Sequence, residues 1–239
     1  MKKNASLARK VALSCRILAK LGLFKETTGH VSARNDTDRM LIRGRGPAES
    51  GLLFTMPGDI ILADFAGKSL ERKAGLKPPN EAVIHGEIYK ARPEVTCVVH
   101  AHPPSVVLCS MAGIELRPIF GGYDPHSMRL SLKGIPVFQS SLTLNTREQV
   151  HAMQNVMGDS DICVLRGHGL IVAGSSVEQA TVTAIKVDTL AKMNLQAASL
   201  GKVPSISDED INEFQTRTGR GNSSAEGLWR YYSEWLMKG

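Results

Sequence analysis

Apolar residues recur at helical spacing in three long stretches of the chain, residues 1–22, 81–89 and 177–200. A period near 3.6 residues is typical of a helix that buries one face. The pattern therefore predicts three helices. Asn80 precedes the second stretch and can cap its free amides, and Pro93 ends it.

Five shorter stretches have the pattern of strands. They are residues 30–34, 40–42, 60–64, 96–102 and 161–165. Strands and helices mix along the chain without an internal repeat, which predicts an α/β fold. A chain of 239 residues can build one sizeable core, so we predict a single domain over residues 1–239. Residues 216–239 are predicted to form its tail, with a mobile Gly- and Ser-rich first part.

Composition narrows the class of protein. Hydrophobic residues make up 42% of the chain and charged residues 22%, as in an ordinary globular protein. The net charge of +6 comes from Lys and Arg residues spread along the chain, which argues against a nucleic-acid partner. No stretch approaches the roughly 18 apolar residues of a membrane-spanning helix, so we expect no membrane partner. Four cysteines without a Cys-x-x-Cys pair indicate buried thiols in a cytoplasmic protein.

Three histidines are candidate ligands of a metal ion. His100 and His102 lie two residues apart at the end of an apolar strand, so their imidazoles point to the same side of the sheet. His168 follows another apolar strand and lies between two glycines. Three imidazoles leave coordination positions open for a substrate, which is typical of a catalytic metal. The alternative is an exposed His-x-His pair and a histidine in an ordinary glycine turn.

Glu81, at the start of a predicted helix, is the best candidate for a carboxylate that ligates the metal or exchanges protons. Its alternative role is that of a surface residue that interacts with the helix dipole. His85 lies one helical turn further on, and we expect it to be a satisfied core or interface histidine.

Together these residues resemble the class II aldolase/adducin family. The likeness includes Asn80-Glu81, His100-Ala101-His102 and Gly167-His168-Gly169 in family order, and it covers most of the chain. The resemblance implies a three-layer α/β/α fold with a mainly antiparallel central sheet, assembled as a homotetramer with active sites at subunit interfaces. It also implies one divalent metal ion per subunit, held by His100, His102 and His168. Glu81 would be a fourth ligand or an acid and base.

The residues that the resemblance places at the substrate differ from those of the family's sugar-phosphate aldolases. Those aldolases hold a phosphate with small hydroxyl and amide groups, whereas here His30 replaces an Asn and the second turn carries Arg43 and Arg45. A guanidinium suits a planar carboxylate. Residues 44–52 and 100–104 are most similar to the family's decarboxylase branch, whose members act on hydroxylated aromatic or pyridine dicarboxylates. The implied substrate-binding residues are Thr28, Gly29, Asn80, Arg43 and Arg45.

The predicted function is metal-dependent decarboxylation of a hydroxylated aromatic or pyridine dicarboxylic acid. Zn²⁺ or Mn²⁺, with Fe²⁺ or Co²⁺ as further options, would stabilise the carbanion or enolate that forms as CO2 leaves. Glu81, His30 or Tyr123 would protonate the product carbon. Two alternatives stay open: a sugar-phosphate aldolase or epimerase whose arginines meet the phosphate, and a metal-free, adducin-like interaction module.

Overall fold

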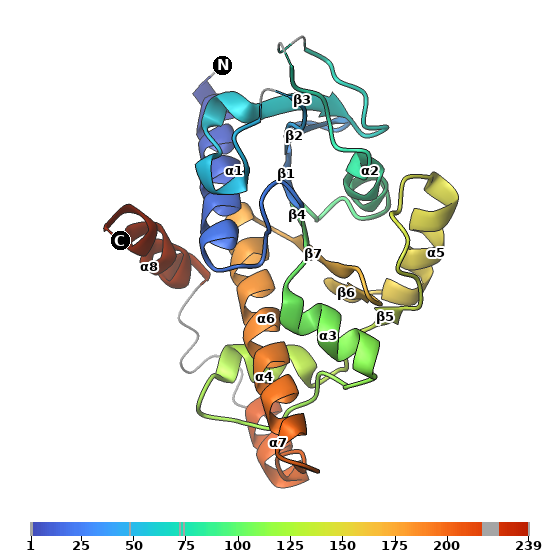
Figure 1. Cartoon of the computed structure of the whole chain (residues 1–239), viewed down its shortest axis with the longest axis vertical. Helices are drawn as coiled ribbons and strands as arrows, with labels where there is room; N and C mark the ends of the chain where they lie inside the picture. Colours follow the sequence, from blue (N-terminus) through green and yellow to red (C-terminus); the bar gives the residue numbers. More distant parts are fainter. Residues whose placement is uncertain (1, 48, 72, 74, 217–224, 239) are drawn as a thin grey trace.

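Seven strands form one sheet at the centre of the computed structural model (Figure 1). The structure describes residues 2–47, 49–71, 73, 75–216 and 225–238. The sheet order is β3-β2-β1-β4-β7-β6-β5, and every pairing is antiparallel except that of β5 with β6. The predicted mainly antiparallel sheet is thus confirmed, with one parallel pair. The strands are β1 (His30–Arg34), β2 (Arg39–Arg43), β3 (Ile60–Asp64), β4 (Cys97–Ala101), β5 (Val137–Phe138), β6 (Ile162–Leu165) and β7 (Gly169–Gly174).

Helices cover both faces of the sheet, as predicted (Figure 1). Buried residues of α1, α3, α4, α6 and α8 join one apolar core, and those of α2 and α5 join the other. The helices are α1 (Lys2–Lys20), α2 (Ala82–Ala91), α3 (Pro104–Ala112), α4 (Pro125–Ser131), α5 (Arg147–Met157), α6 (Val177–Ser199), α7 (Asp208–Thr216) and α8 (Ala225–Lys238). Two short 3-10 helices, η1 (Leu52–Phe54) and η2 (Pro57–Asp59), precede β3.

Side chains along each strand point alternately to the two faces of the sheet, so the strands contribute apolar residues to both cores. In β4, Val99 and Ala101 belong to the core on the α1 and α6 side, whereas Val98 belongs to the core under α2 and α5. His100 shares the face of Val98 because side chains of a strand alternate. Full burial of one large aliphatic side chain stabilises the fold by roughly 1.5–3 kcal/mol. The central strands that carry His30 and His100 are therefore held from both sides.

The sequence pattern located about half of these elements and missed the helices α3, α4, α5, α7 and α8 and the strands β5 and β7. The three predicted helices are α1, α2 and α6, and the five predicted strands are β1, β2, β3, β4 and β6. The expected cap of α2 was wrong, because the helix has Glu81 at its N-cap position and no side-chain cap, so Asn80 lies one residue too early. The strand β7 was missed, because a short apolar run does not by itself distinguish a strand from a buried helix segment.

The C-terminal helix α8 packs against α1 and α6. Nζ of Lys20 in α1 lies 4.4 Å from the ring centroid of Trp235 in α8, which places a cation over an aromatic face. The segment predicted to be mobile includes residues 217–224, which lie outside the described residues.

The cysteines follow the prediction made from their spacing, since all four are free and buried. Among the helices that the structure describes, none has both the length and the apolar character needed to cross a bilayer.

Candidate metal centre and active site

Three imidazoles and one carboxylate converge where the central strands end. The candidate ligand atoms of Glu81, His100, His102 and His168 all lie within 4.8 Å of one another. Nε2 of His100 lies 3.2 Å from Nε2 of His102 and 3.3 Å from Oε2 of Glu81. Ligands about 2.1 Å from one tetrahedral ion would be separated by roughly 3.4 Å. The fold therefore brings the predicted metal ligands together.

The histidines reach the cluster from the sheet and its hairpin. His100 lies in β4 and His102 follows that strand, so both rings project from one face. His168 lies in the turn that joins the antiparallel strands β6 and β7. Gly169 allows this hairpin to approach β4, because a Cβ there would lie 2.3 Å from the carbonyl oxygen of Ala101. Sheet pairing thus sets the separation of the three rings.

Glu81 reaches the cluster from the start of α2. Its Oε1 accepts a hydrogen bond of 3.0 Å from the backbone amide of Leu144 and lies 3.7 Å from Nε2 of His168. Burial acts to raise the pKa of Glu81, but the neighbouring imidazoles of His100 and His30 outweigh it and hold this pKa well below its ordinary value. Glu81 is therefore an oriented carboxylate at neutral pH.

The donor set fits a divalent metal ion. Nδ1 of His100 donates to the carbonyl of Leu170 at 3.2 Å, and Nδ1 of His168 donates to that of Leu142 at 3.1 Å. Because a carbonyl only accepts, Nδ1 carries a hydrogen in both rings, which leaves Nε2 as the nitrogen that can bind a metal ion. Burial lowers the pKa of His102 to about 2 and that of His168 below its ordinary value. Neutral imidazoles with a carboxylate suit Zn²⁺, Mn²⁺, Fe²⁺ or Co²⁺.

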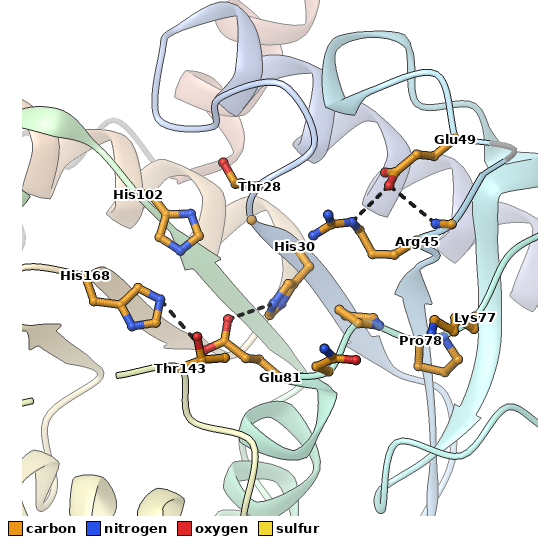
Figure 2. Close-up of a pocket in the computed structure, with 14 residues that line it drawn as sticks. Thr28, His30, Arg45, Glu49, Lys77, Pro78, Glu81, His102, Thr143 and His168 are labelled. Carbon is orange, nitrogen blue, oxygen red and sulfur yellow. Dashed lines mark hydrogen bonds and ion pairs between the residues drawn. The ribbon is translucent and has the colours of Figure 1, made fainter. Parts of the chain in front are cut away.

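A cavity of about 460 Å³ opens beside the cluster. Sites for small molecules typically enclose roughly 300–1,000 Å³. Figure 2 shows His102, His168 and Glu81 turned toward one another on one side of this pocket, with Arg45 and Lys77 on the other. The pocket therefore has a metal end and a cationic end, and we use these two names below.

Arg45 and Lys77 form the cationic end. Their backbones exchange two hydrogen bonds of 2.8 and 2.9 Å, so they are directly opposite residues of an antiparallel bridge. Such residues project their side chains to the same side, and both line the cavity. Arg45 lies where the sequence predicted a substrate-binding residue. Lys77 was missed, because its place opposite Arg45 comes from a bridge between two loops that no local pattern marks.

Arg43 is not among the described residues that line the pocket. It ends β2 facing inward, its side chain is 1% exposed, and its guanidinium pairs with the carboxylate of Glu49. Glu49 Oε1 also accepts from Nε of Arg45 at 3.1 Å. Burial acts to raise the pKa of Glu49, but the hydrogen bond from Arg43 helps to bring it below its ordinary value. Arg43 is thus placed to hold Glu49, which in turn holds Arg45.

The turn that leads into β1 places three predicted residues at the pocket, Thr28, Gly29 and His30. Gly29 has φ 109°, and a Cβ there would lie 2.4 Å from the ring of Phe24, so the turn requires glycine. His30 is 2% exposed, and burial lowers its pKa to about 4, which keeps the ring neutral. Asn80 lines the same wall.

Comparison with known proteins identifies the family. Residues 9–195 match the family described as class II aldolase and adducin N-terminal domain. This chain belongs to that family. The resemblance inferred from the histidines and Glu81 is confirmed.

Relatives in the family match nearly the whole chain. It is 40% identical over 232 residues to the 3,4-dihydroxyphthalate decarboxylase of Arthrobacter keyseri, covering 95% of this chain and 93% of that protein. It is 36% identical over 225 residues to the 3,4-dihydroxyphthalate decarboxylase of Rhodococcus jostii, covering 92% of each. A crystal structure of an aldolase II superfamily protein from Pseudomonas syringae has a TM-score of 0.85, covers 100% of this chain and 94% of that one, and is 20% identical. This last likeness supports the predicted class II aldolase fold.

Tyr123 lies apart from these family site residues. It is 74% exposed, packs edge-on against Phe120 with ring centroids 5.8 Å apart, and is not among the described residues that line the pocket. A catalytic role for Tyr123 would require a second copy of the chain and stays a prediction.

Sequence reasoning also missed Thr143, which lines the pocket next to Leu144. Both belong to the loop before α5, more than sixty residues after Glu81 in the sequence. No local pattern marks this loop, because its approach to Glu81 is made by tertiary packing alone.

Proposed function

We propose that this chain is a metal-dependent decarboxylase of a hydroxylated aromatic or pyridine dicarboxylic acid. The observation that carries the proposal is one pocket with a metal-ligand cluster at one end and two cations at the other. A hydroxylated dicarboxylate has a hydroxyl and carboxylate pair for the first end and a second carboxylate for the other. Near full-length similarity to decarboxylases of dihydroxyphthalate supports the same class of reaction.

In the proposed reaction, the bond between a ring carbon and the carboxylate beside the hydroxyl breaks. Its electron pair stays on the ring carbon that bore the carboxylate, CO2 leaves, and a proton is added to that same carbon. A divalent ion held by His100, His102, His168 and Glu81 would act as a Lewis acid for the negative charge. No oxidant or reductant is needed.

The cationic end would bind and orient the second carboxylate. Arg45 and Lys77 can each donate charge-assisted hydrogen bonds to it. Glu49 restrains the Arg45 guanidinium before the substrate arrives, so less side-chain freedom is lost on binding. A substrate bound at a group remote from the breaking bond would be held in a fixed orientation.

Two described side chains that face the pocket could supply or steer the proton. Glu81 is a carboxylate with a depressed pKa, which favours a role as ligand over a role as stored acid. His30 is neutral and lies with Nε2 3.9 Å from Oε2 of Glu81 (Figure 2). We propose Glu81 as a ligand and His30 as the group that contacts the reacting carboxylate.

We also propose a homotetramer in which a neighbouring copy brings Tyr123 to the pocket. The exposure of Tyr123 supports this arrangement. Light scattering of the purified protein tests the assembly, and a monomer with full activity would refute it. The cytoplasmic location inferred from the cysteines stays a prediction.

The function is tested by metal analysis combined with a CO2-release screen. The panel contains hydroxylated benzene and pyridine dicarboxylates, each matched with its monocarboxylate, and sugar phosphates. Stoichiometric metal with CO2 release from a dicarboxylate is expected. Cleavage of a sugar phosphate without CO2 release would favour the aldolase alternative, since Arg45 and Lys77 also suit phosphate. Folded protein that retains no metal would favour a non-catalytic module.

A further inference from the structure

A row of four buried polar side chains leads from the pocket into the protein. Nδ1 of His30 lies 2.7 Å from Nε2 of His85. Ser32 Oγ lies 2.6 Å from Nδ1 of His85 and 2.6 Å from the Tyr89 hydroxyl. Each of the four residues is at most 2% exposed. The outer end of the row is Nε2 of His30, which faces Glu81 at the pocket wall (Figure 2).

Regular spacing in two elements builds this row. His30 and Ser32 are two residues apart in β1 and share a face of the sheet. His85 and Tyr89 are four residues apart in α2 and share a face of the helix, with Glu81 a further four residues before them. The packing of α2 on β1 therefore joins the four side chains. The expectation that His85 is a satisfied core histidine is met, but its partner is a residue of the pocket.

Burial keeps the members of the row uncharged. Both imidazoles and the Tyr89 phenol are at most 2% exposed, and removing a charged ring from water is costly, so each ring is held in its uncharged form. A neutral imidazole carries one hydrogen, on one of its two nitrogens. Along the row each hydrogen bond has one donor and one acceptor, so the row has only two self-consistent directions.

The two ends of the row select the same direction. At the inner end, the Tyr89 hydroxyl contacts Ser32 Oγ and the backbone of Val98, whose N–H can only donate, and a buried hydroxyl hydrogen without an acceptor is costly. Tyr89 therefore donates to Ser32. At the outer end, Nε2 of His30 lies 3.9 Å from a carboxylate that can only accept. An N–H there is attracted to Glu81, whereas a lone pair would be repelled.

We propose that Tyr89, Ser32 and His85 are positioning residues that keep the hydrogen of His30 on Nε2. Tyr89 donates to Ser32, Ser32 donates to Nδ1 of His85, and Nε2 of His85 donates to Nδ1 of His30. His30 then offers an N–H to an anion in the pocket and has no lone pair at Nε2 with which to act as a base. The tautomer is independent of the reaction, whereas its use in holding a substrate carboxylate rests on the proposed function.

Nitrogen NMR of the zinc-loaded protein, labelled with ¹⁵N in histidine, tests the tautomer without any substrate. The signals of His30 and His85 are assigned by their loss in His30→Asn and His85→Gln. Both rings are expected to carry hydrogen on Nε2 and none on Nδ1 at neutral pH. A hydrogen on Nδ1 of either ring would overturn the proposal, even if the protein releases CO2. If both rings have the expected tautomer but the protein releases no CO2, the tautomer proposal is supported and the proposed decarboxylase function is refuted.

Variants of His85 test the positioning role in the active enzyme. His85→Leu removes the donor to His30, and we expect KM to rise about tenfold, the effect of one lost hydrogen bond, with kcat changed less. His85→Gln keeps an N–H donor at this place and should recover most of the affinity. Ile88→Val is the matched control, because Ile88 is buried on the same helix outside the row, and it should leave KM unchanged.

Equal KM values in His85→Leu and the parent enzyme would refute the positioning role. A similar loss in Ile88→Val would do the same, since it would show a general response to core changes. If His85→Leu does not fold, Ser32→Ala replaces it. The same rise in KM with an altered His30 tautomer then supports the proposal, and an unchanged tautomer overturns it.

Discussion

The two ends of the pocket are built in different ways. At the metal end, His100 is fully buried in a central strand and Glu81 is 9% exposed at the start of a packed helix. At the cationic end, Arg45 and Lys77 come from loops joined by a single bridge, and the Arg45 side chain is 32% exposed. A sheet holds ligand atoms within tenths of an ångström, whereas a loop tolerates exchange of side chains. Under the proposed function, the rigid sheet would hold the metal ion and the more adaptable loops would bind the second carboxylate of the substrate.

The largest effect is expected at the metal end. His102→Ala should remove bound metal and lower kcat/KM by at least about 10³-fold, because a Lewis acid supplies several kcal/mol of stabilisation to the developing charge. Elemental analysis and CO2 release measure the two losses together. Circular dichroism confirms that the variant is folded. Full metal content in this variant would show that His102 is not a metal ligand and would contradict the proposed site.

Glu81→Gln sharpens the role of the carboxylate. The amide oxygen of Gln can still accept from the backbone of Leu144, so the side chain keeps its position while losing its charge. We expect a fall in kcat of about 10²-fold or more, as for a removed acid or base. Metal affinity that falls in parallel identifies Glu81 as a ligand, and unchanged affinity identifies an acid and base. An unaltered kcat would exclude both roles.

The cationic end should govern affinity and leave the metal in place. Arg45→Ala or Lys77→Ala removes a charge-assisted hydrogen bond worth about 1.5–3 kcal/mol, so KM for a dicarboxylate should rise roughly 10- to 100-fold. The matched substrate without the second carboxylate serves as control, because the variants should lose nothing with it. An equal rise in KM for both substrates would show that these cations do not bind the second carboxylate.

The smallest effect is expected from the carboxylate that braces the cationic end. Glu49→Gln keeps an acceptor for Arg43 but loses its charge, so the free energy of unfolding should fall by about 1–2 kcal/mol at pH 7. The pKa of Glu49 is depressed in the folded protein, so its contribution is present above the unfolded value near 4.5 and is lost as pH falls through the folded value. Urea unfolding of metal-free parent and variant should therefore converge below about pH 4.5. A constant difference across this range would contradict the pairing.

Much of the metal end could be predicted from local patterns. A period of two put His100 and His102 on one face, and glycines around His168 marked a turn after a strand. The cationic end could be predicted only in part. Arg43 and Arg45 are two residues apart in the sequence, but their side chains have different surroundings in the structure. Strand β2 directs Arg43 into the protein, and the bridge to Lys77 directs Arg45 into the pocket.

The sequence by itself determined which residues can share a face. Spacings of two in β1 and β4 and of four in α2 follow from backbone geometry, so they hold before any packing is known. Only the tertiary structure decided that α2 lies over β1, which joins Tyr89 to His30, and that the loop before α5 holds Glu81. These contacts join residues far apart in the chain. They depend on which apolar faces pack together, and no local spacing records that choice.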